Sequence, residues 1–277
     1  MRIKLHLKPV RDKQALIFNY QYAIQAWIYG LLARSDKDYS QFLHDEGYLI
    51  GESKKSFKHF TFSSLQLGRT KLIQKGDKHI ELSLDTIFLT LSFCVDSAAK
   101  AFMIGLFQSQ ELSLFNMDYK ADFIVERVES LQIPALHFNH SQTVTKIFKV
   151  DSPMVLAEEK NGITEYISPI DSRYERLFSI NLWDKYRSLE KTKSFDLDPN
   201  LVQNIIQWKL VSNPENIKRK GLIVKEGKGK QQIKIIGFEN LTFEVTAPEN
   251  VLAVGYLGGF GKYCAMGCGF TNIVTEE

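Results

Sequence analysis

The sequence predicts an α+β protein made of two successive units, each with its strands and helices in the order βαββαβ. Three observations predict this arrangement. The hydrophobic period switches repeatedly between about two and about 3.6 residues over 1–132. Proline, asparagine and serine interrupt the pattern over 132–142, and a similar order of elements then starts again. Domains usually contain about 100–200 residues, so a chain of 277 residues is long enough for two of them.

The first unit, residues 1–132, begins with RIKLHLKPV, in which apolar and charged residues alternate as in a strand. Apolar residues at helical spacing predict a helix over 19–34. A shorter helix follows, with Ser35 or Asp36 as its cap and Gly47 as its stop. Further elements are three β-like stretches over 58–67, 71–84 (a hairpin around KGDK) and 86–95, a capped helix over 96–108 and strand over 111–131.

The second unit, residues 142–277, is predicted to begin with strands over 143–150 and 153–159 and a long amphipathic helix over 171–191. Residues 217–238 predict a hairpin with a mobile tip, KEGKGKQ. A strand over 241–247, a helix over 248–258 with Pro248 near its start, and a last strand over 269–275 follow. Both units are therefore predicted to be ferredoxin-like, or RRM-like, βαββαβ domains.

The composition is that of a globular protein, with 44% hydrophobic and 24% charged residues. The sequence has no apolar run of membrane-spanning length, and its N-terminus lacks the apolar block of a signal peptide, so it predicts a cytoplasmic protein. The three cysteines, Cys94, Cys264 and Cys268, indicate free thiols. They argue against a four-ligand zinc site, because Cys264 and Cys268 have no second pair to complete it.

Positive charge is concentrated in one segment, although the net charge is only +3. Residues 212–238 contain seven basic and two acidic residues, whereas 241–277 contain one basic and four acidic residues. A basic segment of this kind can neutralise the phosphates of a polyanion and raise the rate of encounter with it. The alternative is an ordinary solvated hairpin.

The stretch GYLGGFGKYCAMGCGF, residues 255–270, contains six glycines, and two Gly-x-Gly units flank KYCAM. Glycine permits positive φ and close backbone approach, and successive N–H groups can then line an anion site. The alternative is a tight helix-to-strand turn packed on its neighbour. The stretch is not a Walker loop, because GKY stands where GK[ST] is needed, and it lacks the Gly-x-Gly-x-x-Gly of a dinucleotide site.

At this position, after two ferredoxin-like units, the glycine-rich stretch resembles the C-terminal loop of the RAMP superfamily of CRISPR-associated proteins. WIYGLL, FLHDEGY and FKHFTFSSL, with SPIDSRYERLFSINLWDKY in the second unit, are similar to the family of endoribonucleases that cut CRISPR repeat RNA. The resemblance covers nearly the whole chain. It implies catalytic roles for Tyr29, His44 and Lys58. Three neighbours compete with Lys58 for the last role, namely Lys54, Lys55 and His59.

The resemblance implies a metal-independent transesterification that needs no cofactor. The 2′-hydroxyl of the RNA attacks the adjacent phosphorus, and the products are a 2′,3′-cyclic phosphate and a 5′-hydroxyl. His44 suits the role of general acid or base, because the free pKa of histidine lies near working pH, and a lysine ammonium suits the charge on phosphate. The carboxylates do not cluster as they would in a two-metal nuclease.

The implied partner is CRISPR repeat RNA, both as pre-crRNA and as mature crRNA, and a second copy of the chain and a CRISPR effector complex are further candidates. We expect RNA contacts from the basic hairpin, 218–236, and from the glycine-rich loop. The candidate residues are Lys218, Arg219, Lys220, Gly259, Gly261, Lys262, Gly267 and Gly269. Two alternatives remain: a RAMP subunit that binds guide RNA without cutting it, and an unrelated small-molecule enzyme on the same fold.

Overall fold

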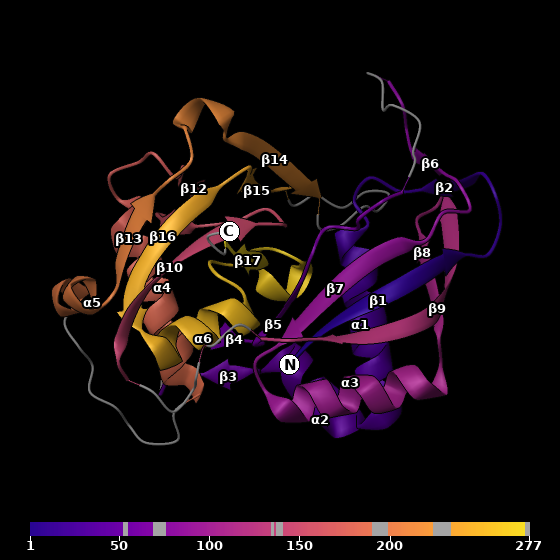
Figure 1. Cartoon of the computed structure of the whole chain (residues 1–277), viewed down its shortest axis with the longest axis horizontal. Coiled ribbons are helices and arrows are strands. Elements are labelled where there is room, and N and C mark those ends of the chain that lie inside the picture. Colours follow the sequence, from indigo (N-terminus) through magenta and orange to yellow (C-terminus); the bar gives the residue numbers. More distant parts are fainter. Residues whose placement is uncertain are drawn as a thin grey trace.

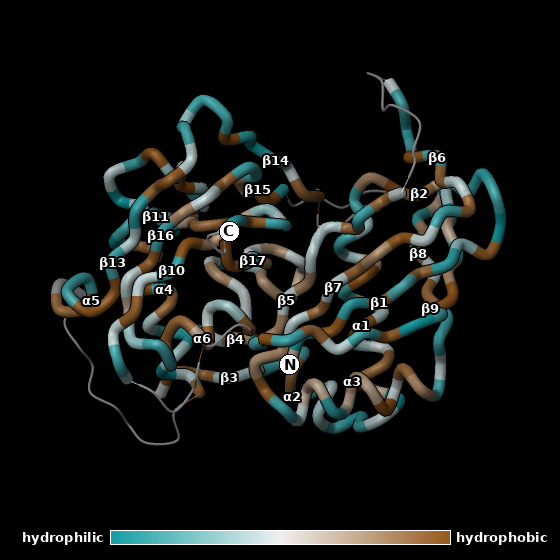
Figure 2. The backbone as a smooth tube through the Cα atoms, viewed as in Figure 1, coloured by the Kyte–Doolittle hydropathy of each residue, from teal (hydrophilic) through white to brown (hydrophobic). Residues whose placement is uncertain are grey.

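The computed structural model describes residues 1–51, 55–68, 76–133, 136, 141–189, 199–223 and 234–274. Figure 1 shows two sheets side by side, each with its helices packed against one face. Hydrophobic and hydrophilic residues alternate along most strands and helices in Figure 2, as expected where only one face is buried. Among the described helices, none is both long and apolar enough to cross a bilayer.

The first half forms a five-stranded antiparallel sheet in the order β5-β7-β1-β9-β8. Without the added edge strand β8, this is the strand order of a ferredoxin-like unit, so the predicted fold is confirmed here. The elements are β1 (Arg2–Pro9), α1 (Gln21–Ser35), α2 (Lys37–Asp45), β5 (Phe60–Phe62), β7 (Ile87–Phe93), α3 (Asp96–Gln108), β8 (Glu111–Phe115) and β9 (Lys120–Leu131).

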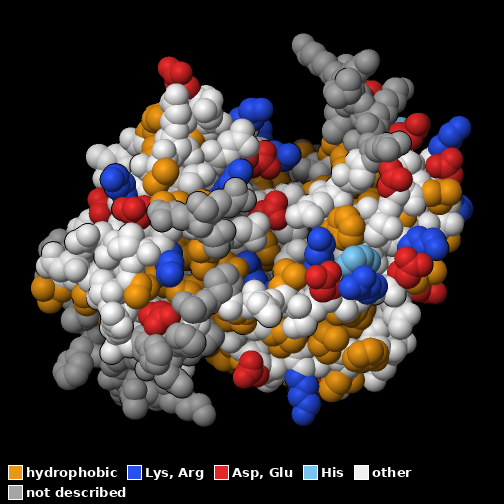
Figure 3. Space-filling view, viewed as in Figure 1, with side chains coloured by type: hydrophobic (Ala, Val, Ile, Leu, Met, Phe, Trp, Pro, Cys, Tyr) orange, Lys and Arg blue, Asp and Glu red, His pale blue; other side chains and the backbone are white. Residues whose placement is uncertain are grey.

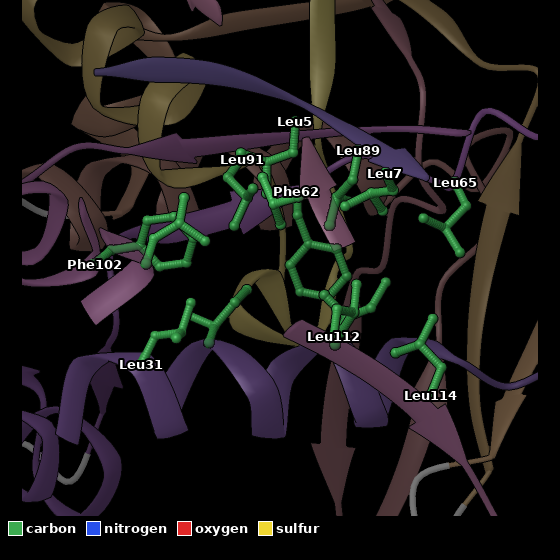
Figure 4. Packing of buried hydrophobic residues seen from close by; sticks show 14 of the residues in the cluster. Leu5, Leu7, Leu31, Phe62, Leu65, Leu89, Leu91, Phe102, Leu112 and Leu114 are labelled. Atoms are coloured by element: carbon green, nitrogen blue, oxygen red, sulfur yellow. The ribbon is translucent and has the colours of Figure 1, made fainter. Parts of the chain in front are cut away.

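The core of this half lies between the sheet and the helices α1 and α3 (Figure 4). Leu5 and Leu7 of β1 are buried, as the alternation in the sequence predicts, and they face the same side as Phe62 and Leu89. Leu31 lies on the buried stripe of α1, below this face of the sheet. Burial of such side chains contributes about 1.5–3 kcal/mol each, which is why the amphipathic pattern decides how the helix packs.

Four short strands extend this half. They are β2 (Gln14–Leu16), β3 (Tyr48–Leu49), β4 (Ser56–Phe57) and β6 (Ile80–Leu82). β6 pairs with β2, and the first arm of the hairpin predicted around KGDK, residues 71–75, lies outside the described residues. β3 pairs with β4, and this small hairpin leads directly into the segment that contains Lys58 and His59.

The second half forms a four-stranded antiparallel sheet in the order β13-β16-β10-β17, which is again the ferredoxin-like order. The elements are β10 (Thr143–Val150), α4 (Tyr174–Leu189), α5 (Pro199–Ile205), β13 (Gln207–Leu210), β16 (Thr242–Pro248), α6 (Glu249–Gly258) and β17 (Thr271–Ile273). The sequence pattern predicted neither α5 nor β13, although β13 is the second strand of the unit. The domain limits 1–132 and 142–277 remain a prediction.

Two hairpins lie outside this sheet. One pairs β11 (Ala157–Lys160) with β12 (Ile163–Tyr166), so the strand predicted over 153–159 is shorter and begins at Ala157. The other pairs β14 (Lys218–Ile223) with β15 (Lys234–Glu239) and confirms the predicted basic hairpin. The KEGKGKQ tip of that hairpin lies outside the described residues.

A buried arginine joins the two halves. Arg2 of β1 is 2% exposed and donates hydrogen bonds to the hydroxyl of Tyr256 and the carbonyl of Thr271. Its guanidinium carbon lies 3.8 Å from the ring centroid of Tyr256 and 4.1 Å from that of Phe270. Burial lowers the pKa of Arg2 to about 10. These contacts hold β1 against α6 and β17.

Candidate functional site

The three residues with predicted catalytic roles lie together where α2 ends. The rings of Tyr29 on α1 and His44 in the last turn of α2 meet edge to face, with centroids 5.3 Å apart. Lys58 donates a hydrogen bond from Nζ to the backbone carbonyl of His44 over 2.9 Å. The chain therefore brings a phenol, an imidazole and an ammonium group to one place.

Local sequence features explain this placement. The carboxylate of Asp36 accepts a hydrogen bond from the backbone N–H of Tyr39 and caps the start of α2, as predicted. Gly47 ends the helix with φ +70°, a conformation that favours glycine. A Cβ at Gly47 would lie 2.9 Å from Lys58 Nζ, so the missing side chain also makes room for the lysine.

A carboxylate orients the imidazole of His44. Asp45 Oδ1 lies 2.7 Å from His44 Nδ1, and this hydrogen bond holds the pKa of Asp45 below its usual value. Because Nδ1 is engaged and the His44 side chain is 69% exposed, Nε2 is the nitrogen left for proton exchange with a ligand. This contact of Asp45 was not predicted, because its only signal in the sequence is an acidic residue directly after the histidine.

The environments of Lys58 and Tyr29 suit charge stabilisation and hydrogen-bond donation. Burial lowers the pKa of Lys58, while the charges of Asp45 and Glu46 oppose that shift. Burial raises the pKa of the Tyr29 hydroxyl well above its usual value. Tyr29 therefore stays protonated at neutral pH and can donate a hydrogen bond, but it is a poor base.

The three other candidates for the role of Lys58 do not lie beside His44 as Lys58 does. Lys54 lies outside the described residues. Lys55 Nζ lies 2.8 Å from Asp184 Oδ2 on α4. His59 is 2% exposed, and its Nε2 lies 2.7 Å from Ser188 Oγ. Burial, with a smaller effect of Lys185, lowers the pKa of His59 to about 3, so this ring is neutral at working pH and unsuited to general acid–base catalysis.

The shifted pKa of His59 predicts a pH-dependent stability. Its folded pKa, about 3, lies below the ordinary value of 6.5, so between these values the unfolded chain binds a proton that the folded chain does not. This difference stabilises the folded protein fully above pH 6.5. As the pH falls from 6.5 towards 3, the free energy of unfolding decreases by about 1.4 kcal/mol per pH unit. From pH 7 to pH 5, wild-type protein should lose about 2 kcal/mol more than a His59→Asn variant.

Urea unfolding at both pH values measures this difference. Asparagine is a suitable replacement because it tolerates the left-handed backbone of His59, at φ +54°. If the free energies of unfolding of the two proteins fell by the same amount from pH 7 to pH 5, His59 would not resist protonation in the folded state.

A cavity of about 680 Å³ lies beside this cluster, between the two halves of the molecule. Its lining includes Lys58 and His59 after β4, Asn181 and Lys185 on α4, and Lys262 and Tyr263 in the glycine-rich loop. Its volume is within the range of about 300–1,000 Å³ that is usual for small-molecule sites.

The glycine-rich loop connects α6 to β17 as a tightly packed turn. Its four Gly-x-Gly glycines all have positive φ, at +86° for Gly259, +77° for Gly261, +74° for Gly267 and +69° for Gly269. A Cβ at Gly261 would lie 2.4 Å from the carbonyl oxygen of Val155, and a Cβ at each of the other three would lie 1.8–2.8 Å from its nearest neighbouring atom. The N–H groups of Gly267 and Gly269 donate to the carbonyls of Cys264 and Pro153.

These four glycines therefore fit the second of the two predictions for this stretch, a tight helix-to-strand turn packed on its neighbour. Protein atoms occupy the space beside them and take up two of their N–H groups, so those two are not available to an anion. Lys262 and Tyr263 are the exposed residues between the two glycine pairs. RNA contacts by this loop remain a prediction, and among its predicted residues Lys262 is the one with an exposed side chain.

A buried lysine holds the loop in place. Lys185 of α4 is 3% exposed and donates a hydrogen bond to the carbonyl of Gly259, and its Nζ lies 3.0 Å from the sulfur of Cys264. The helical pattern over 171–191 includes Lys185, but nothing in the sequence indicates that its side chain is buried. The contact joins residues that are far apart in the sequence, so no local pattern could have revealed it.

The basic hairpin is not close to the cluster at His44. In Figure 1, β14 and β15 lie at the top of the molecule, whereas α2, β3 and β4 lie at the bottom. Lys218, Arg219 and Lys220 are exposed on β14, and Figure 3 shows lysine and arginine side chains over this part of the surface. Lys220 Nζ lies 3.7 Å from Glu239 Oε1, so part of its charge is balanced.

Comparisons with known proteins agree with this fold. Residues 15–129 match a family model described as CRISPR-associated protein Cas6, N-terminal, and residues 136–273 match one described as CRISPR associated protein Cas6, C-terminal. The chain is 24% identical over 278 residues to a Pyrococcus furiosus protein named CRISPR-associated endoribonuclease Cas6. The match covers 99% of this chain and 90% of that protein.

Two solved structures have a similar fold over their whole length. One is described as a Cas6-related gene product from Pyrococcus furiosus, with a TM-score of 0.74 and 21% identity, covering 100% of this chain and 99% of that chain. The other is described as an RAMP protein binding different RNA substrates, with a TM-score of 0.72 and 20% identity, covering 99% of this chain and 100% of that chain.

Proposed function

The chain belongs to the Cas6 family of CRISPR-associated endoribonucleases, and we propose that it cleaves CRISPR repeat RNA through attack of a ribose 2′-hydroxyl on the adjacent phosphorus. The products would be a 5′-hydroxyl and a 2′,3′-cyclic phosphate. One observation carries this proposal: an exposed histidine, oriented by a carboxylate, lies beside a half-buried lysine. These groups supply the proton transfer and the positive charge that the reaction needs.

Each residue of the cluster has a separate role in this proposal. His44 exchanges a proton through Nε2, either with the attacking hydroxyl or with the leaving oxygen. Lys58 uses one N–H for the carbonyl of His44, so two remain for the non-bridging oxygens of the phosphate. Tyr29 packs edge-on against His44, restricts the ring and can donate a hydrogen bond. Asp45 holds the reactive tautomer and stabilises the imidazolium form.

The reaction should need the ribose hydroxyl and should not need a metal ion. We expect full cleavage of repeat RNA in excess EDTA and no cleavage when the scissile nucleotide carries 2′-deoxyribose, because the nucleophile is then missing. Denaturing gels and mass analysis of the product ends measure both results. Cleavage of the deoxy substrate would contradict the mechanism. Tight binding of the normal repeat without cleavage would instead support the non-catalytic RAMP subunit.

The basic hairpin is our candidate for binding the phosphates of the repeat. Replacing Lys218, Arg219 and Lys220 with alanine should weaken RNA binding and reduce the slope of log K against log salt by about 2, since each phosphate contact contributes roughly 0.7–0.9 and Lys220 is partly paired. Fluorescence anisotropy over a salt series measures both quantities.

A matched control removes three exposed lysines from other elements, Lys100, Lys160 and Lys209, and so changes the net charge by the same amount. Equal losses in the two variants would show that only net charge matters and would remove the hairpin from the RNA site. A second copy of the chain, a CRISPR effector complex and a cytoplasmic location remain predictions.

A further inference from the structure

Tyr263, in the glycine-rich loop, has a backbone conformation that tyrosine rarely adopts. Its φ is +60° and its ψ is +30°, in the left-handed region that favours glycine and asparagine. The four Gly-x-Gly positions around it also have positive φ, and each of them is a glycine. Asn161 and Asn240 occupy two other left-handed positions of the chain. The requirements of the turn therefore do not explain why this position carries a tyrosine.

Backbone hydrogen bonds on both sides of Tyr263 hold this conformation in place. The N–H of Lys262 donates to the carbonyl of Val155 over 2.7 Å, and the carbonyl of Tyr263 accepts from the N–H of Met266 over 2.9 Å. Strained residues persist only where the surrounding structure fixes them, and they are common at binding sites and active sites. The loop therefore holds one aromatic residue in a fixed position at a cost in backbone strain.

A ligand in the cavity of about 680 Å³ can reach Tyr263, because this residue lines the cavity and is 38% exposed. Lys262, directly before it, also lines the cavity and is exposed. Phe57, Leu177 and Ile180 supply apolar surface to the same lining. An accessible aromatic ring beside a lysine and apolar walls matches a nucleotide, whose base is flat and whose phosphate is anionic.

Tyr263 lies between the two parts of the molecule that the proposed function assigns to RNA. On one side, Lys58 lines the same cavity and contacts His44. On the other side, burial and the neighbouring hydroxyl of Tyr263 together raise the pKa of Tyr166 to about 12. The hydroxyl of Tyr166 donates a hydrogen bond over 3.2 Å to the carbonyl of Lys234, at the start of β15 in the basic hairpin. The cavity and the basic hairpin are therefore joined through this pair of tyrosines.

We propose that the ring of Tyr263 stacks on one unpaired base of the repeat RNA, close to the cleaved bond. The inference rests on the proposed function, because it assumes that RNA occupies the cluster at His44. Stacking on an aromatic side chain tolerates every base, since each base has a π face. Tyr263 therefore holds a nucleotide beside the reacting phosphate without selecting which base it carries.

Removal of single bases from the RNA tests the proposal. Each unpaired nucleotide near the cleaved bond is replaced in turn by an abasic one. All RNAs carry 2′-deoxyribose at the scissile nucleotide so that they stay intact, and fluorescence anisotropy measures their affinity. We expect one abasic position to weaken binding to the wild-type protein by about tenfold, which is within the usual range for stacking of one base on an aromatic side chain.

Two variants of Tyr263 assign the effect to its ring. Tyr263→Asn removes the ring and suits the left-handed backbone, so it should unfold at the same or a higher urea concentration than wild-type protein. The abasic position should no longer weaken RNA binding by this variant. Tyr263→Phe keeps the ring and should keep the tenfold loss. If the asparagine variant fails to fold, Tyr263→Gly replaces it, because glycine has no steric penalty at this φ.

Three results would overturn the stacking. They are a tenfold loss at the abasic position that survives in the asparagine variant, the absence of any sensitive position in wild-type protein, and a loss of sensitivity in the phenylalanine variant, which would assign the contact to the hydroxyl. Failure of wild-type protein to cleave the natural repeat would overturn the proposed function instead, and the binding of uncleavable RNA is measured independently of that result.

Discussion

Replacing His44 with alanine is expected to lower the rate of repeat RNA cleavage by about 10²–10⁴-fold, which is the usual contribution of one positioned proton transfer. The affinity for uncleavable RNA should change little, because the imidazole acts on the reacting atoms and supplies little of the binding energy. The fold should also be unaffected, since the His44 side chain is 69% exposed and lies outside both hydrophobic cores. Single-turnover cleavage at saturating protein measures the chemical step.

Two further variants make this test specific. His6→Ala removes another histidine that also pairs with a carboxylate, Glu129, but lies on β1 away from the cluster, so it should leave the rate unchanged. Asp45→Asn keeps the size of the side chain but removes the charge that stabilises the imidazolium, and it should cause a smaller loss than His44→Ala. Full activity of His44→Ala would remove the histidine from the mechanism.

The sequence predicts the parts of the fold that depend on local periodicity. The alternation of Ile3, Leu5 and Leu7 predicts a strand with one buried face, and the structure confirms it. β13 was missed because its four residues are too few to show a period, and its strand form depends on pairing with β16. Such a strand is defined by its neighbours in space, which a single sequence does not reveal.

In the candidate site, too, features with a local sequence pattern were predicted and features that depend on long-range contacts were not. Resemblance to the RAMP endoribonucleases singled out Tyr29, His44 and Lys58, and the structure brings them together, although their roles remain a proposal. The contact of His59 with Ser188 joins residues 129 positions apart, and that of Lys185 with the Gly259 carbonyl spans 74 positions. Neither has a local signature, so the cavity between the two halves could not be predicted from the sequence.

Gly269→Ala is expected to destabilise the protein strongly. The residue has φ +69°, and a Cβ there would lie 1.8 Å from the backbone oxygen of Phe260, which cannot move aside like a flexible side chain. Phe260 is fully buried and stacks on Phe178 with ring centroids 5.6 Å apart, so any displacement disturbs the second core. Left-handed strain and overpacking together should cost about 2–5 kcal/mol, measurable by urea unfolding.

Gly162→Ala separates the two causes of that loss. Gly162 has a similar φ of +75°, but a Cβ there would meet nothing within 4 Å, so only the left-handed strain of about 1–2 kcal/mol should remain. Equal losses in both variants would show that the crowding at Gly269 is not important. A larger loss at Gly269 would mean that the glycines are required by packing. Weak RNA binding by Gly269→Ala would then reflect a displaced loop, from which Lys262 and Tyr263 project, and not a lost contact between glycine and RNA.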